Sequence, residues 1–316
     1  MAYSAGDAIL DDEYNVFVNS SSDPFGYNHF AGPGSAQYGL NQSTISTVSA
    51  GDTVQASSWN ALFTGLDNIA NHTNVSITSS SVSAGDAIAI RSALVSDLAN
   101  LAAAVAGGST SATAIGSAAA GATSNSGTWN ATSTIERSVT FANNNTMRAF
   151  FNGGGFIRIA PTATTGIDGL KDTVFADLCT AVGNLDLKAQ ASTRSGSGET
   201  LTTNGLANGF HDLGTGYTSI IKLTSDNSGY TSDTLEISAK LNAAVGSATV
   251  LTIKQVASDP AADTTYTSGN TDGVAANPNE APVMTLTLTE NYPTDAQGLA
   301  AAIRVASNAA VSNSIS

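Results

Sequence analysis

The stretch SAGDTVQASSWNALF, residues 49–63, begins with a four-residue phrase that occurs three times in the chain. The other copies of Ser-Ala-Gly-Asp occupy residues 4–7 and 83–86. Glycine permits a left-handed backbone, and the aspartate side chain accepts hydrogen bonds from the amides that follow it. The phrase therefore predicts a turn that leads into a helix. The glycines expected in these turns are Gly6, Gly51 and Gly85.

The spacing beyond the phrase is repeated as well. An aromatic–asparagine pair follows at the same distance in the first two copies, as Tyr14-Asn15 and Trp59-Asn60, whereas Ala93-Leu94 replaces it in the third. Apolar residues then recur at three- and four-residue intervals, which is typical of amphipathic helices. After the second copy they are Trp59, Leu62, Phe63, Leu66 and Ile69, and after the third they are Leu94, Leu98, Leu101 and Val105. A shorter helix is expected from about Asp11, which suits an N-cap.

The composition limits the partners that the chain can bind. Its 316 residues are enough for two or three domains, and only 11% are charged, compared with roughly 25% in a typical soluble domain. The 25 acidic and 11 basic residues give a net charge of -14, which repels phosphate and argues against nucleic-acid binding. The amino terminus lacks a signal-peptide pattern, and no apolar run approaches the roughly 20 residues that span a bilayer, so we expect no membrane insertion.

The second part of the chain is predicted to be rich in β-strands. Residues 109–126 are small and nearly featureless, and we interpret them as a linker. Residues 135–143 alternate as a strand does, and residues 147–161 indicate a strand, a tight glycine turn and a second strand. The side chains expected on one side of the first strand are Ile135, Arg137, Val139 and Phe141. Four more runs with strand chemistry are residues 217–225, 233–242, 248–258 and 281–291.

A helix within residues 167–187 interrupts this series, because Leu170, Val174, Leu178 and Ala181 share a helical face. Alanines near 296–306 read as helical and precede a polar tail. We therefore predict an α+β fold, with an amino-terminal helical segment followed by a mainly antiparallel β-sandwich-like region with one inserted helix. The expected domains are a docking or oligomerisation region at 1–108, a linker at 109–126, and a β-rich region at 127–316 that could divide near 190–215.

No local pattern of catalytic residues is present in the sequence. Cys179 lies in an apolar context that is typical of a buried, inert helix residue. The three histidines His29, His72 and His211 are far apart and have no metal-ligand spacing. The glycines at 153–155 precede a strand, whereas a phosphate-binding loop precedes a helix. We therefore predict no catalytic residues, no metal ligands and no cofactor-binding residues.

Calcium is the one ion for which the sequence offers suitable oxygen donors. Two loops carry several aspartates, at residues 224–233 and 258–273. The aspartates are Asp226 and Asp233 in the first loop and Asp259, Asp263 and Asp272 in the second. Neither loop matches the twelve-residue pattern with its closing glutamate, and solvated hairpin turns are the favoured interpretation.

Two stretches resemble a group of virion structural proteins of tailed bacteriophages, often contractile-tailed phages of cyanobacteria and other marine bacteria. The first is AGDTVQASSWNALFTGLDNIANHT, residues 50–73, with its Gly-Asp turn, Trp-Asn helix and terminal histidine. The second is IERSVTFANNNTMRAFFNGGGFIRI, residues 135–159, and residues 216–242 are similar to the downstream strands of the group. The third Ser-Ala-Gly-Asp copy and the alanine-rich segment 101–122 are departures from the group. The resemblance implies a virion component and no active site.

We therefore expect a non-enzymatic structural component of a phage particle, assembled in the host cytoplasm and attached in several copies to the neck, tail or baseplate. Its expected partners are other copies of itself and other virion proteins. The alternative is an adhesin or receptor-binding fibre protein that contacts a host-surface glycan. A depolymerase would need two adjacent carboxylates, which a sequence cannot locate. The residues proposed as interface anchors are Trp59, Leu62, Phe63, Leu66, Phe150, Phe151 and Phe156, although a place in the core of the same chain is the favoured interpretation for any one of them.

Overall fold

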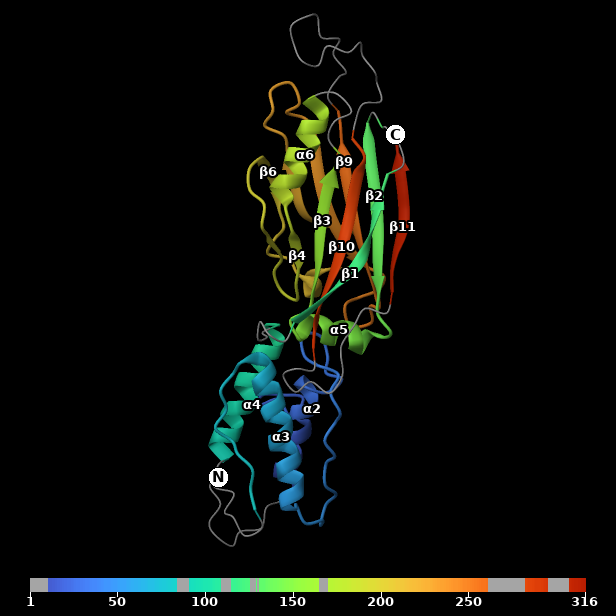
Figure 1. Ribbon diagram of the computed structural model, residues 1–316. Helices are drawn as coiled ribbons and strands as arrows, with labels where there is room; N and C mark the ends of the chain where they lie inside the picture. Colours follow the sequence, from blue (N-terminus) through green and yellow to red (C-terminus); the bar gives the residue numbers. More distant parts are fainter. Residues whose placement is uncertain are drawn as a thin grey trace, which may run out of the picture. The chain divides into compact units, whose positions relative to one another are not determined.

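Two compact units make up the chain (Figure 1). The computed structural model describes residues 11–83, 91–108, 115–125, 129, 131–164, 170–260, 282–294 and 307–316. The first unit comprises residues 1–116, 143–155 and 292–304, and we call it the helical unit. The second comprises residues 117–142, 156–291 and 305–316, and we call it the sandwich unit. The chain therefore leaves and re-enters each unit.

The helical unit contains five helices among the described residues. They are α1 (Asp11–Asn19), α2 (Tyr27–Phe30), α3 (Ala56–Thr73), α4 (Arg91–Ala106) and α5 (Asn144–Asn152). The predicted apolar face of α3 is buried, and Trp59 on that face packs edge-on against Tyr14 of α1, with the ring centroids 5.2 Å apart. The Tyr14 hydroxyl also donates to the Ser58 carbonyl oxygen at 3.1 Å. The aromatic residues of the repeated pair thus hold the first and third helices together.

The second Ser-Ala-Gly-Asp copy forms the predicted turn. The Asp52 N–H donates to the Ser49 carbonyl oxygen at 2.9 Å, and Gly51 has a φ of +88°. A positive φ at the third position is what a type II turn requires, which explains the glycine. Helix α3 begins at Ala56, shortly after this turn, so the prediction for Gly51 is confirmed. Gly6 and Gly85 lie outside the described residues.

The asparagine of the repeated aromatic–asparagine pair holds the chain just before the next copy of the phrase. Asn15 accepts the Val48 N–H and donates to the Val48 carbonyl oxygen, both at 2.9 Å. Asn60 does the same with Val82, at 2.8 and 2.9 Å. Val48 and Val82 each directly precede a Ser-Ala-Gly-Asp phrase. Each of these two helices therefore fixes the segment that leads into the next repeat.

A third aromatic–asparagine pair, Tyr27-Asn28 in α2, makes the same contact although no phrase precedes it. Asn28 exchanges two hydrogen bonds of 2.8 Å with the backbone of Ile45. The degenerate third repeat has Leu94 in place of the asparagine, and α4 uses another residue instead. The buried Asp97 carboxylate accepts the N–H groups of Thr78 and Ser79, at 3.0 and 2.8 Å. We call the pairs Asn15–Val48, Asn28–Ile45 and Asn60–Val82 the asparagine clamps.

The sandwich unit consists of two sheets, one α-helix and the short 3-10 helix η2 (Phe210–Asp212) in the described part of the chain (Figure 1). The five-stranded sheet has the order β1 (Ile115–Ser124), β10 (Met284–Pro293), β3 (Phe156–Ala163), β4 (Leu185–Leu187), β5 (Thr193–Arg194). The six-stranded sheet has the order β11 (Ser307–Ile315), β2 (Thr132–Thr140), β9 (Val250–Ser258), β8 (Thr234–Leu241), β7 (Thr218–Thr224), β6 (Thr200–Asn204). Helix α6 (Leu170–Val182) contacts strands of both sheets and is the predicted inserted helix.

The alternation of strand residues matches the predicted fold class. β2 pairs antiparallel with β9 and β11, and β10 pairs antiparallel with β3. Met284, Leu286 and Leu288 are buried while the threonines between them are half-exposed, as the period of two requires. The α+β fold with a sandwich-like region is therefore confirmed. Near 190–215, where a further division was expected, the chain passes from β5 in one sheet to β6 in the other within a single compact unit.

Three local predictions were wrong. The first arm of the predicted hairpin is helix α5: Asn143 caps it by accepting the Thr146 N–H at 2.9 Å, and buried Met147, Phe150 and Phe151 share a helical face. Residues 115–124 of the predicted linker form β1, whose small side chains do not alternate between apolar and polar. The predicted polar tail forms β11, because pairing with β2 satisfies the backbone hydrogen bonds of the strand although neither of its faces is buried.

Asn60→Leu tests the asparagine clamps, because leucine occupies the equivalent position in the third repeat. The loss of two hydrogen bonds to the Val82 backbone should lower the free energy of unfolding by about 1–3 kcal/mol, measured by urea denaturation. Asn71→Leu in the same helix is the matched control, since Asn71 is exposed and bonds only to the Asp67 side chain. We expect this control to change stability by less than about 0.5 kcal/mol. Equal effects of the two substitutions would contradict the assignment.

Candidate functional site

No metal-binding cluster is found in the part of the chain that the structure describes. Within those ranges, no three His, Cys, Asp or Glu side chains come together as metal ligands would. His29 stacks on Phe25 at 4.5 Å between ring centroids, and His211 packs edge-on against Phe210 at 4.9 Å.

Asp233 and Asp259 of the two acidic loops are buried, at 0% and 3% exposed, and so do not lie in the solvated turns that were favoured, whereas Asp226 is exposed. Asp263 and Asp272 lie outside the described residues, so calcium binding stays an untested hypothesis.

None of the helices among the described residues is both long and apolar enough to cross a bilayer.

A buried polar cluster joins α5 to the rest of the helical unit. The His72 side chain, at the end of α3, is fully buried, and its Nε2 lies 2.9 Å from the carbonyl oxygen of Gly153. A carbonyl oxygen only accepts hydrogen bonds, so Nε2 must carry the proton. Burial lowers the pKa of His72, while the bond to Gly153 acts in the opposite direction. His72 is therefore a neutral donor that ties the glycine turn after α5 to α3.

Arg148 provides the largest set of hydrogen bonds in this cluster. Its side chain is only 4% exposed, and its guanidinium donates to the carbonyl oxygens of Pro33 and Tyr38, at 2.9 and 3.1 Å. It also donates to the side-chain oxygens of Asn144 and Asn145, at 2.9 and 2.7 Å. All four acceptors are neutral, and desolvation lowers the pKa of the guanidinium. The planar fork suits such a set of carbonyls better than an ammonium would.

The cluster therefore fixes a loop and offers no open reactive group. Buried Asn152 donates to the Gly39 carbonyl oxygen at 3.1 Å, so two α5 side chains, Arg148 and Asn152, bind the loop at residues 33–39. Gly39 needs its positive φ of +108°, and its N–H donates to the Phe30 carbonyl oxygen at 2.9 Å. These groups are engaged with backbone, which is typical of structural support and not of acid–base chemistry.

Six of the seven predicted interface anchors lie inside their own chain. The two phenylalanines of α5 pack edge to face at 5.0 Å, and the four residues of α3 belong to its buried face. The six buried residues are Trp59, Leu62, Phe63, Leu66, Phe150 and Phe151. Phe156 is half-exposed and lies 5.6 Å from the Arg158 guanidinium. A surface for other proteins must therefore be formed largely by other residues.

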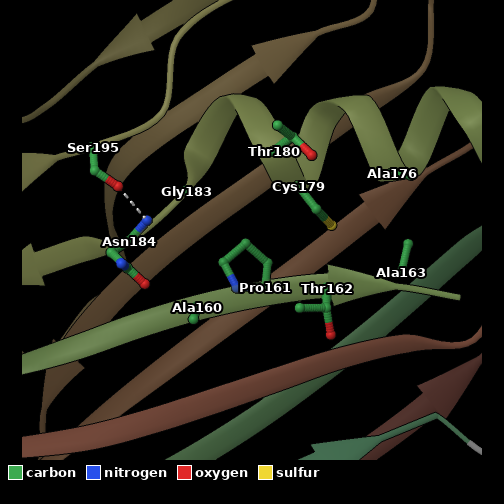
Figure 2. A pocket seen from close by; sticks show the side chains of 10 residues that line it. All are labelled: Ala160, Pro161, Thr162, Ala163, Ala176, Cys179, Thr180, Gly183, Asn184 and Ser195. Carbon is green, nitrogen blue, oxygen red and sulfur yellow. Dashed lines mark hydrogen bonds between the residues drawn. The ribbon is translucent and has the colours of Figure 1, made fainter.

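A cavity of about 360 Å³ lies beside α6 in the sandwich unit (Figure 2). It is lined mainly by small side chains of β3, α6 and the turns that follow, and Ser195 Oγ accepts the Asn184 N–H at 2.9 Å at one end. Burial raises the pKa of Cys179, the lining thiol, to about 12, so no thiolate forms at neutral pH. Among the described residues that line the cavity there is no carboxylate or imidazole, so none of them offers the usual general base.

The buried arginines were the residues that sequence reasoning explained least. Arg137 lies on the inward face of β2, where the alternation places it between Ile135 and Val139. Its guanidinium donates to the Thr123 hydroxyl of β1 and to the Asn308 side-chain oxygen of β11, the latter at 2.6 Å. The sequence did show a charged residue in the middle of an otherwise apolar row of β2, which could have indicated a buried arginine. It could not show which residues would accept its hydrogen bonds.

No protein-family model, curated protein or solved structure matches this chain.

The burial of His72 predicts a pH-dependent stability. Its pKa is lowered in the folded state, so the unfolded chain binds this proton first as the pH falls below about 6.5, and folding becomes less favourable. We expect the free energy of unfolding to fall by at most about 1.4 kcal/mol per pH unit relative to His72→Gln, which cannot titrate. Urea denaturation between pH 7 and pH 5 measures this difference. Parallel pH curves for the two proteins would rule it out.

Cys179 should resist alkylation while the chain is folded. Its buried thiol has too high a pKa to supply thiolate, so iodoacetamide at mildly alkaline pH should leave the folded protein unmodified. The same reagent in urea should add one group, because the chain has one cysteine. Intact-mass spectrometry gives both results. Rapid modification without urea would show that the cavity opens to solvent.

Proposed function

We propose that this chain is a non-enzymatic structural component of a tailed-phage particle. In this proposal it is attached to the neck, tail or baseplate in several copies and works through protein–protein contacts. The observation that carries the proposal is the bond between His72 and Gly153, which lie 81 residues apart. His72 belongs to one stretch that resembles phage virion proteins, and Gly153 belongs to the other. The distinctive residues of both stretches therefore contribute to one buried cluster of the helical unit.

The way the chain satisfies its polar groups supports the same proposal. The asparagine clamps and the α5 cluster use neutral amides and carbonyls, and both buried arginines use neutral acceptors. Only 11% of the residues are charged, so few charges need to be desolvated when the chain meets another protein, and interface cores are depleted in charged residues. Repeated copies around a particle axis add up weak contacts. The helical unit is the part that we assign to docking, and the sandwich unit is the part that projects or decorates.

A glycan-binding adhesin is the second candidate, and its support is weaker. Sugar recognition would use exposed aromatic rings, yet every Trp, Tyr and Phe in the described ranges is buried or half-exposed. Tyr217, a half-exposed ring, is covered by the ammonium groups of Lys240 and Lys254, at 4.3 and 3.9 Å from the ring centroid. Protein contacts are therefore the better-supported role.

Mass spectrometry of purified particles of the source phage tests the proposal. We expect the chain to be present in several copies per particle, and electron microscopy of the particle should locate it at the neck, tail or baseplate. Empty capsids purified from the same lysate serve as the control, since a neck or tail protein should be depleted there. Absence from particles, or a free monomer that cleaves a polysaccharide, would overturn the proposal.

A further inference from the structure

Strand β3 is longer than its neighbour on one side, so part of its edge is open. β4 pairs only with residues 157–159 of β3, whereas β10 pairs with the whole strand. Beyond Ile159, the edge at residues 160–163 has no neighbouring strand among the described residues. Helix α6 lies there instead, and the cavity of about 360 Å³ is lined by both elements (Figure 2). The cavity is therefore a groove between a strand edge and a helix, and we call it the β3 groove.

The hydrogen bonds of the sheet show which backbone groups of β3 point into the groove. In an antiparallel pair, successive residues direct their N–H and C=O groups to opposite sides. The Thr164 N–H donates to the Val283 carbonyl oxygen at 3.1 Å, so the even-numbered residues of β3 face β10. The odd-numbered residues face the other way, and beyond the end of β4 these are Pro161 and Ala163.

Three backbone groups are therefore left for a further strand. They are the carbonyl oxygen of Pro161 and the N–H and carbonyl oxygen of Ala163, and no described residue forms a hydrogen bond with any of them. Proline has no N–H, and a proline at a strand edge restricts pairing. The groove therefore suits a short segment, held by a few backbone bonds, and not a long added sheet.

The end of α6 explains why β4 does not fill this place. The register of β3 and β4, continued by two residues, would set Gly183 opposite Pro161. Instead, the Gly183 N–H donates to the Cys179 carbonyl oxygen at 2.9 Å and so completes the helix end. Gly183 has a φ of +61°, and a Cβ there would lie 2.6 Å from the Gly196 nitrogen. The chain is thus held away from the edge of β3 at this point.

The lining of the β3 groove favours a segment with small, uncharged side chains. None of the lining residues is charged, and the Cys179 thiol is neutral because burial raises its pKa to about 12. Figure 2 shows this thiol pointing from α6 toward β3. A charged side chain would lose its hydration in such a groove without gaining a partner. The volume lies within the range of about 300–1,000 Å³ that is typical of ligand sites.

We propose that the β3 groove binds an extended segment of another protein, which adds to the open edge of β3 in line with β4. Backbone hydrogen bonds give affinity in such strand addition, and the walls of the groove select the side chains. A second copy of this chain is a poorer partner, because each copy carries a net charge of -14 and the two repel. The inference rests on the proposed function for the source of the segment, which is another protein of the same particle.

Amide hydrogen exchange of the full chain, followed by NMR, tests whether the edge is open and can be paired. In the free protein the Ala163 N–H should exchange at least about tenfold faster than the Ala160 N–H, which faces β10. An excess of the blocked peptide acetyl-AVATA-amide should slow exchange at Ala163 about tenfold and leave Ala160 unchanged. The same peptide with a fully N-methylated backbone is the control, because it cannot donate to the carbonyl oxygens of β3.

Thr180→Trp should block the groove. Thr180 lines the groove and is exposed on α6, so an indole there occupies the space of the added segment without disturbing the core. We expect the affinity for the peptide, measured from NMR shifts, to fall about tenfold or more. Thr64→Trp, at an exposed threonine of α3, is the matched control and should bind like the wild type. Circular dichroism should show the wild-type spectrum for both variants.

Slow exchange at Ala163 in the free protein would overturn the proposal, because residues of the chain itself would then already fill the edge. Unchanged exchange at about 10 mM peptide, or equal peptide binding by Thr180→Trp and the wild type, would also overturn it. These results concern the groove alone, and the virion role is judged by the presence of the chain in particles. A chain that binds the peptide but is absent from particles would support the groove and overturn the proposed function.

Discussion

Backbone groups that lie outside helices and sheets need hydrogen-bond partners, and this need governs the helical unit. The segments before Ser49 and Ser83 lie in no sheet, yet they must cross helix surfaces. An asparagine side chain carries a donor NH2 group and an acceptor oxygen side by side, so it can satisfy the N–H and C=O of a single residue as a neighbouring strand would. The clamps at Val48 and Val82 do this, and each fixes the chain directly before a Ser-Ala-Gly-Asp phrase. The repeat therefore positions each helix through the backbone of the segment that follows it.

The buried arginines are also satisfied by neutral hydrogen-bond partners. Arg148 in the helical unit and Arg137 in the sandwich unit each bind oxygens from segments distant in sequence, without a carboxylate partner among those contacts. Such a buried cation is costly unless its donors are satisfied, so the surrounding backbone must stay in place. In the sandwich unit this connects β2 to the two edge strands β1 and β11. These bonds hold the edge strand β11 in place, and β11 itself carries no charged residue.

Helix α5 shows how far local sequence patterns can be trusted. The run Met147–Phe151 is short and apolar, and a glycine turn followed by an alternating strand favoured a hairpin. The segment forms a helix and not a strand because Asn143 caps the first turn of the helix. In addition, the helical conformation lets Arg148 and Asn152 both reach the loop at residues 33–39. The first reason could have been read from the sequence, since asparagine is a preferred N-cap. The second could not, because it depends on residues more than a hundred positions away.

The sequence by itself determined the α+β class, the helices after the repeated phrase, and the strands whose residues alternate with a period of two. These features rest on local periodicity and on the backbone freedom of glycine, which neighbouring residues are enough to express. Only the tertiary structure decided what holds the elements together: the valines that the asparagines bind, the carbonyls that Arg148 and His72 reach, and the pairing that turns 307–315 into a strand. Hydrogen bonds between distant segments produce no periodic pattern in the amino-acid sequence, because the positions of the residues in space determine which of them become partners.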